Sequence, residues 1–205
     1  MIRFSFFALF SILFLTTCGN GLVQVEQEDQ FGNIIKYTKN PKTNAVQGTW
    51  VRMSPDKVKL EEAEYNGGTL NGKRTLYFEN GKPEVVETYA NGTFEGPFQL
   101  FYESGQLKQE GTYKNGETIG EWKGYYENGQ LKEIVTFAGN LENGPFTEYH
   151  ENGKLKTEGN YVDGDNEDGV LKEYDDTGTL VTKKECKMGV CQTIWTKDMD
   201  ENNDE

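Results

Sequence analysis

The chain has 205 residues, with 21 Lys and Arg against 34 Asp and Glu and a formal net charge of −13 at pH 7. A body this acidic is repelled by nucleic-acid phosphates and by anionic lipid headgroups, so the composition argues against nucleic-acid binding. Hydrophobic residues make up only 35% of the chain, but 3 Trp, 11 Tyr, 12 Phe and 24 Gly are too aromatic a mixture for a disordered chain. The length suits one domain, and we expect a thin structure with an aromatic core.

The first residues predict export. Arg3 precedes an almost unbroken apolar run over residues 4–17, which Cys18 follows. This pattern is typical of a secretory signal peptide, and the run is shorter than the roughly 20 residues that span a membrane. The four residues ending at Cys18 resemble a bacterial lipobox, from which Thr17 departs. We therefore expect a signal peptide over 1–17 and a lipidated Cys18; the alternative is an ordinary cleaved signal with an incidental cysteine.

Three further segments follow in chain order. Residues 18–48 carry the lipidated cysteine, a tether and a degenerate first hairpin near 31–37. Residues 49–195 form a repeat domain, and the acidic residues 196–205 are expected to be a disordered tail.

An internal repeat is the strongest feature of the sequence. The glycine of a recurring four-residue turn is spaced by 24, 24, 24 and then 25 residues, at Gly81, Gly105, Gly129, Gly153 and Gly178. Eight residues after each glycine stands an aromatic residue or, in the last copy, a cysteine: Tyr89, Tyr113, Phe137, Tyr161 and Cys186. A period of this length indicates a repeat architecture.

The recurring turn predicts a hairpin. Asn-Gly between alternating segments favours a two-residue type I′ loop, because both residues tolerate positive φ. With Asn128 and Gly129 as the loop, Tyr126 pairs with Leu131, Gly124 with Glu133, and Trp122 with Val135. Trp122, Tyr126, Leu131, Val135 and Phe137 then share one face of the sheet, and Tyr125 lies on the other, more polar face.

The same register gives specific cross-strand pairs. Phe98 falls opposite Gly111 and Phe146 opposite Gly159, an arrangement in which a ring covers bare glycine backbone. The outer copies instead have Arg74 with Glu87 and Leu171 with Lys184. We interpret these pairs as polar end caps of the repeat array.

The predicted fold is all-β: an elongated, single-layer antiparallel β-meander of hairpins about 24 residues long. Units such as YYENGQLKEIVTF and EYHENGKLKTEGNY resemble the MORN-repeat variant of bacterial proteins, a family often labelled antitoxin-like. The resemblance implies the fold but no activity. Its antitoxin label implies a cytoplasmic partner, which conflicts with the predicted export signal.

Few residues suggest chemistry. His150 is the single histidine, so we expect neither a zinc site nor a catalytic triad, and it stands where other copies have a packing aromatic. We predict no enzyme activity, no catalytic residue and no cofactor. Asp163, Asp165 and Glu167 alternate as in a calcium loop, but the glycine and glutamate that such a loop needs are missing, and a solvated repeat loop is the simpler interpretation.

Two cysteines remain after Cys18. Cys186 and Cys191 flank the connection after the last hairpin, and an exported protein matures where disulfides form. We predict a bond between them that closes a short loop and contributes roughly 2 kcal/mol to the stability of that end.

These features together predict a lipid-anchored interaction scaffold of the bacterial cell envelope, either periplasmic or surface-exposed. The membrane is contacted through the N-terminal lipid only, and the partner is a protein or a glycan. The expected binding face carries Phe101, Tyr125 and Tyr149, since aromatic side chains are enriched at binding hot spots. The alternatives are a structural envelope protein that self-associates through its edge or face, or an antitoxin-like immunity protein.

Overall fold

A computed structural model describes residues 12–17 and 21–201 of the chain. The described residues are almost entirely β-strand, and they fall into two compact units that meet between Thr93 and Phe94. Within this described part, no helix is long and apolar enough to cross a membrane.

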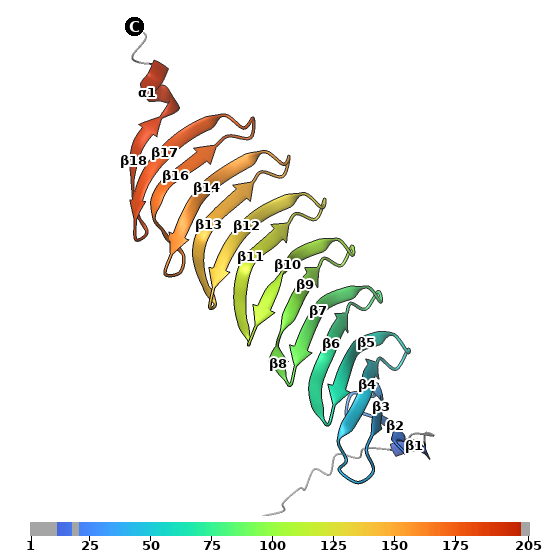
Figure 1. Ribbon diagram of the computed structural model, residues 1–205. Coiled ribbons are helices and arrows are strands. Elements are labelled where there is room, and N and C mark those ends of the chain that lie inside the picture. The colour runs from blue at the N-terminus through green and yellow to red at the C-terminus, as the bar shows by residue number, and fades with distance from the viewer. Residues whose placement is uncertain (1–11, 18–20, 202–205) are drawn as a thin grey trace, which may run out of the picture. The chain divides into compact units, whose positions relative to one another are not determined.

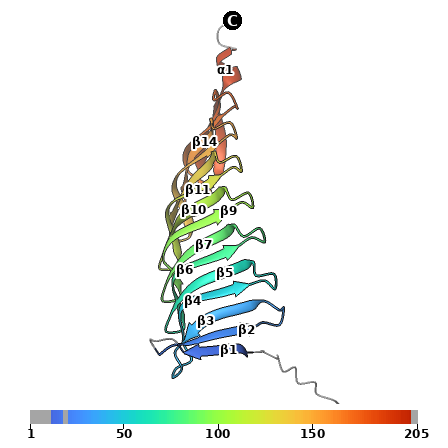
Figure 2. The ribbon, with the colours of Figure 1, turned by 90° about the vertical axis from the view of Figure 1, so that its right-hand side faces the viewer.

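The first unit is an antiparallel meander in which each strand pairs with the next along the chain (Figures 1 and 2). Its strands are β1 (Ile12–Thr17), β2 (Val23–Glu28), β3 (Ile34–Lys39), β4 (Val46–Met53), β5 (Lys59–Asn66), β6 (Thr69–Tyr77) and β7 (Pro83–Ala90). The two-residue strand β8 (Thr93–Phe94) contains the boundary between the units.

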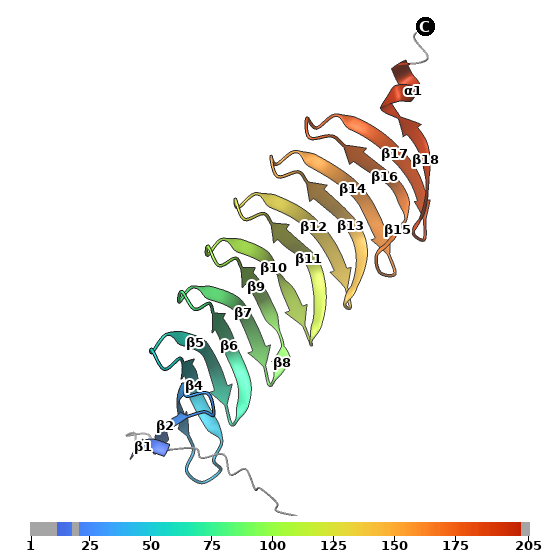
Figure 3. The ribbon, with the colours of Figure 1, turned by 180° about the vertical axis from the view of Figure 1, so that it is seen from behind.

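The second unit continues the same hairpin pattern (Figure 3). Its strands are β9 (Gly96–Phe101), β10 (Leu107–Lys114), β11 (Glu117–Tyr125), β12 (Leu131–Ala138), β13 (Leu141–Tyr149), β14 (Leu155–Val162), β15 (Asn166–Glu167), β16 (Gly169–Tyr174), β17 (Leu180–Lys187) and β18 (Val190–Thr196), followed by the helix α1 (Lys197–Glu201). The predicted all-β, single-layer antiparallel meander is thereby confirmed within each unit.

The turn chemistry differs from the sequence prediction. At the recurring turn Gly129 has a φ of 86°, but Asn128 keeps a negative φ, so the loop is not type I′. The Gly129 N–H donates to the Tyr126 carbonyl and the Tyr126 N–H to the Gln130 carbonyl, which defines a three-residue loop with a type I turn and a left-handed glycine. The Asn128 side chain accepts a hydrogen bond from the Gln130 N–H (2.9 Å), which favours this form.

Type I′ turns occupy the other ends of the hairpins. Asn115 and Gly116 have φ values of 52° and 84°, and Lys114 lies directly opposite Glu117. Met188 and Gly189 repeat this conformation between β17 and β18.

The extra loop residue changes the register beside the recurring turn. Gly124 lies opposite Glu133 and Trp122 opposite Val135, as predicted. A β-bulge then places Tyr125, not Tyr126, opposite Leu131. The assignment of Leu131 to the face of Trp122 was therefore wrong, because one bulge moves every side chain beyond it relative to the partner strand.

Aromatic rings fill the core face of the second unit. Trp122 is 6% exposed and packs against Phe98, Tyr113 and Phe137, with ring centroids 5.5, 5.1 and 5.9 Å away. Phe98 lies opposite Gly111 as predicted, but the ring that covers Gly111 belongs to Trp122. At the other predicted pair, a Cβ added to Gly159 would stand 2.8 Å from both the Phe146 ring and Leu171. Rings from neighbouring strands thus bury one another on a single sheet.

The first unit has an ionic layer at the equivalent position. Arg74 lies opposite Glu87, and its guanidinium donates to Glu61 (2.8 Å) and to Glu87 (3.0 Å). The interpretation of this pair as an end cap was wrong, since the preceding hairpin continues the core with Trp50 opposite a fully buried Ala63. Arg74 is therefore an internal layer of the first unit.

Both ends of the described chain contain more regular structure than predicted. Residues 23–28, assigned to a tether, form β2, because Val23 and Val25 alternate with polar residues and Val25 is buried against the sheet. Residues 12–17, within the predicted signal peptide, pair with β2 as β1. At the other end, Thr196 closes β18 and residues 197–201 form α1 where a disordered tail was expected; this segment contains no Gly or Pro to oppose a helical turn.

Candidate functional site

One pair of apolar side chains recurs at the bulged end of each hairpin in the second unit. An aromatic residue at the end of one strand lies opposite a leucine at the start of the next: Phe101 with Leu107, Tyr125 with Leu131, Tyr149 with Leu155 and Tyr174 with Leu180. We call these eight residues the aromatic–leucine ladder. All of them are half-buried, and the predicted binding residues Phe101, Tyr125 and Tyr149 belong to it.

Hydrogen bonds between hairpins fix the spacing of the ladder. The Tyr102 hydroxyl donates to the backbone carbonyl of Tyr125 (2.8 Å), and the Tyr126 hydroxyl donates to that of Tyr149 (2.7 Å). His150 replaces the tyrosine in the next copy, where its Nε2 lies 2.9 Å from the Tyr174 carbonyl. The histidine therefore takes over the hydrogen bond that the tyrosine hydroxyls make in the other copies.

The ladder hydroxyls differ in what they contact. Tyr125 donates to Glu110 and Tyr174 donates to Glu158, each at 2.8 Å. Burial, together with the bond to Glu110, raises the pKa of Tyr125 to about 12. The equivalent position for Tyr149 is Ile134, and within the described chain the Tyr149 hydroxyl has no hydrogen-bond partner. Tyr149 is thus the ladder tyrosine whose hydroxyl can bond to another molecule.

Lysines surround the ladder in a regular arrangement. One lysine follows the leucine in three successive copies, at Lys108, Lys132 and Lys156. Lys108 lies 5.4 Å from the centre of the Tyr102 ring, and Lys156 pairs with Glu148 at 3.0 Å. A hollow of about 140 Å³ opens beside Tyr125 between two of these lysines. The ladder therefore combines half-buried rings with a cationic rim.

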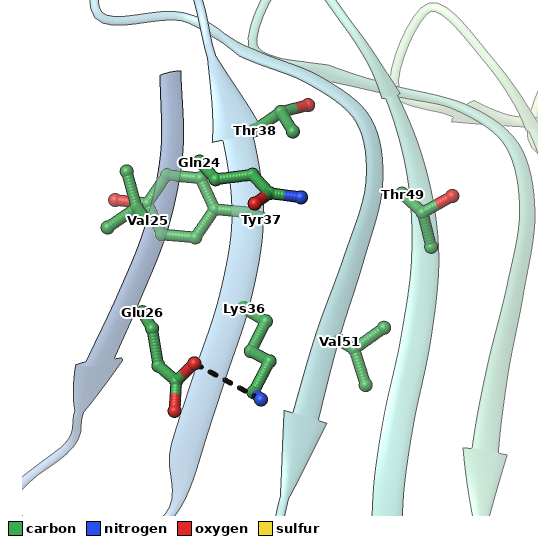
Figure 4. Close-up of a pocket in the computed structure, with 8 residues that line it drawn as sticks. All are labelled: Gln24, Val25, Glu26, Lys36, Tyr37, Thr38, Thr49 and Val51. Carbon is green, nitrogen blue, oxygen red and sulfur yellow. Dashed lines mark ion pairs between the residues drawn. The ribbon is translucent and has the colours of Figure 1, made fainter. Parts of the chain in front are cut away.

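A larger hollow lies on the first unit. It has a volume of about 500 Å³ and is lined by residues of β2, β3 and β4. Figure 4 shows Glu26 and Lys36 side by side on neighbouring strands of this hollow. These two side chains form an ion pair of 3.1 Å, and the Thr38 hydroxyl donates to the Gln47 carbonyl. The lining offers hydroxyls, an amide and one neutralised ion pair, a set that can hold a small polar group but includes no nucleophile with an adjacent base.

The two predicted disulfide cysteines are joined in the structure. Cys186 lies opposite Cys191 across the β17–β18 hairpin and is 2% exposed. The bond packs against Phe146 and Leu171, so it belongs to the core of the second unit as well as to its last hairpin.

The other predicted sites gain little from the structure. Cys18 lies outside the described residues. Asp163 and Asp165 occupy the turn between β14 and β15, and Glu167 belongs to β15. No group of acidic, cysteine or histidine residues in the described part of the chain is arranged to hold a metal ion. The hydroxyl-to-carbonyl bonds were not predicted from the sequence, although an aromatic residue or a histidine stands directly before each of four successive turns.

Comparison with protein families identifies the repeat. Four segments match the family described as MORN repeat variant: residues 70–91, 94–115, 119–138 and 142–163. These segments cover the hairpins from β6 to β14, and the structure continues the hairpin pattern on both sides of them. A comparison with curated proteins finds no match.

Proposed function

Because the chain is a MORN-repeat protein, we propose that it acts as an exported, lipid-anchored and non-catalytic scaffold that binds a protein partner at the bacterial cell envelope. The observation that carries this proposal is the aromatic–leucine ladder, which presents the same pair of side chains from successive hairpins of one rigid sheet. Neighbouring strands lie about 4.8 Å apart, so one ladder step is roughly 10 Å.

The chemistry of the ladder suits a protein better than a glycan. Each ring lies half-buried opposite a leucine, so the ladder offers mixed aromatic and aliphatic contacts. Charged residues of both signs lie near them in the sequence, such as the cation Lys108 and the anion Glu103. A half-buried aromatic surrounded by polar groups is the usual arrangement of a protein–protein hot spot.

Export and lipid attachment rest on the sequence of residues 1–18. If Cys18 is the first residue of the mature chain, five residue steps separate it from Val23, where β2 begins. A fully extended segment of this length spans roughly 17 Å. The first unit, with the hollow on β2–β4, would then be held close to the membrane surface.

The binding proposal is tested with two matched substitutions. Tyr149→Phe removes a hydroxyl that has no partner among the described residues, whereas Tyr125→Phe removes one that bonds to Glu110. Quantitative pulldown from envelope extract should show that Tyr149→Phe and Tyr149→Ala reduce capture of the same protein, with unchanged thermal unfolding for Tyr149→Phe. Tyr125→Phe should instead lower stability. Equal capture by wild type and Tyr149→Ala would contradict the proposal.

The anchor is tested separately. Metabolic labelling with a palmitate analogue should label the wild-type chain and leave Cys18→Ser unlabelled, and the variant should leave the membrane fraction. Labelling that survives in Cys18→Ser, or an unlabelled wild type, would refute lipidation without affecting the ladder.

A further inference from the structure

β18 is an edge strand without a single charge. Its residues are Val190, Cys191, Gln192, Thr193, Ile194, Trp195 and Thr196. Among the described residues, 12–17 and 21–201, it pairs with β17 and with no other strand. Figure 3 shows α1 continuing past the end of β18 and not lying along its outer side. Natural edge strands are normally protected by charges, Pro or a covering element; β18 contains no charge and no Pro, and no element of the described chain covers it.

Exposed apolar side chains concentrate around this strand. Five large hydrophobic residues near it are about half exposed or more: Val170 (47%), Met188 (50%), Val190 (70%), Ile194 (53%) and Met199 (47%). Elsewhere in the described part of the second unit, Leu141 is the one comparable residue, at 51%. Val190 and Ile194 lie on β18 itself, so this edge offers apolar side chains as well as open backbone for contact.

The geometry of the β17–β18 hairpin shows which backbone groups face outward. The Cα atoms of Cys186 and Cys191 are 4.0 Å apart, the close spacing of a non-hydrogen-bonded antiparallel pair. The N–H and C=O of Cys191 therefore point away from β17, and by alternation so do those of Thr193. The disulfide and the type I′ turn at Met188 and Gly189 hold this edge in place.

We propose that β18 pairs antiparallel with β18 of a second copy of this chain. Each chain carries a net charge of −13, so most self-contacts would place acidic groups together. A β18–β18 contact avoids this cost, because neither strand brings a charge. If residues 1–17 are cleaved as proposed, β2 becomes the first strand, and its Glu26 and Glu28 would repel its own copy.

One register satisfies the outward-facing groups of both strands. It places Cys191 of each copy opposite Thr193 of the other, so that their free N–H and C=O groups bond across the two-fold axis. Gln192 then lies opposite its own copy at the axis, and the exposed Val190 lies opposite Ile194. The pairing needs neither the lipid nor a foreign partner, so it stands apart from the proposed function.

Light scattering of the full chain in detergent micelles, evaluated for protein mass alone, tests the pairing. Wild type should show twice the mass of one chain at high concentration, and the dimer should persist as salt is raised, since no ion pair holds it. Ile194→Lys combined with Thr193→Pro should weaken the dimer by more than about tenfold, because each copy then brings a charge and lacks an outward donor. Leu141→Lys, equally exposed but remote from β18, should leave the dimer intact.

A second variant tests the register. Gln192→Cys should form a reducible dimer on a non-reducing gel, since the two new cysteines face each other at the axis, whereas Leu141→Cys should not. The proposal fails if wild type has the mass of one chain at every concentration. It also fails if the dimer survives Ile194→Lys with Thr193→Pro, or if Leu141→Lys dissociates it equally.

Discussion

The position that holds Arg74 in the first unit holds Phe98, Trp122 and Phe146 in the second. Arg74 bonds to Glu61 and Glu87, and Glu61 also pairs with Arg52 at 3.3 Å. Desolvation alone would lower the pKa of Arg74, but the two glutamates outweigh it and the pKa is raised. In the second unit the same position is filled by rings that pack against rings.

The comparison shows what a single-layer sheet demands of its core face. Within each unit, no second layer of described residues covers these side chains, so each is buried by neighbours on the same face. The aromatic row, formed by Phe98, Trp122 and Phe146, meets this requirement through ring contacts. The ionic row, formed by Arg74 with its two glutamates, meets it when each charge has a partner with good geometry. A repeat array tolerates both, since each hairpin contacts chiefly its neighbours.

The largest expected effect falls on the aromatic row. Trp122→Ala removes the ring that contacts Phe98, Tyr113 and Phe137, and it should lower the free energy of unfolding by about 3 to 5 kcal/mol. Denaturant unfolding followed by circular dichroism measures this loss. Trp195→Ala, at the end of β18, should cost clearly less; equal losses would show that the aromatic row has no special role.

The ionic row can be replaced by the pair found in the second unit. Arg74→Phe should cost about 2 to 3 kcal/mol, because Glu87 loses its cationic partner on a half-buried face and keeps the hydrogen bond from the Tyr89 hydroxyl. Adding Glu87→Gly recreates the pair of Phe98 and Gly111, and it should recover part of the loss, since Glu61 keeps Arg52. A double variant less stable than Arg74→Phe would show that the two rows are not interchangeable.

The sequence predicted the hairpin period and most of the cross-strand pairs. Phe98 with Gly111, Phe146 with Gly159 and Trp122 with Val135 are found as expected, because a 24-residue period with alternating side chains leaves few registers open. The turn type was not predicted correctly. Asn-Gly suits both a type I′ loop and a type I turn with a left-handed glycine, and only the observed hydrogen bonds at Tyr126 decide between them.

The candidate site was predicted in position but not in detail. Phe101, Tyr125 and Tyr149 do recur on successive hairpins. Their separate roles depend on the residue 15 positions earlier, which is Glu110 for Tyr125 and Ile134 for Tyr149; Glu110 accepts the hydroxyl bond of Tyr125, and an isoleucine side chain offers no acceptor. The Arg74 layer was mistaken for an end cap because the copy containing Trp50 and Ala63 has diverged from the repeat pattern.

Replacing the glycine beneath the aromatic row is expected to lower the stability less than removing the ring does. Gly111→Ala places a Cβ against the Trp122 ring, which must shift, at a cost of about 1 to 2 kcal/mol. Gly124→Ala is the matched control, since the added Cβ would meet the flexible side chain of Glu133 at 2.6 Å. Thermal unfolding should show the larger shift for Gly111→Ala. A larger shift for Gly124→Ala would mean that the ring over Gly111 moves freely.

The smallest loss of stability is expected from breaking the ion pair of Lys172 with Glu158, which is more exposed than that of Arg74 with Glu87. Hydrogen bonds from Lys172 and Tyr174 lower the pKa of Glu158 below its usual value of 4.5. A lowered pKa means that the carboxylate stabilises the fold above pH 4.5 and that this contribution is lost as the pH falls below that value. Glu158→Gln should therefore be slightly less stable than wild type at pH 7, and the difference should vanish near the lowest pH at which the protein still folds.

Adding Lys172→Met should remove most of the difference in stability at pH 7. High salt should reduce this difference, because solvent screens this pair far more than it screens Arg74. A difference that persists undiminished in acid would show that Glu158 acts through packing and not through its charge.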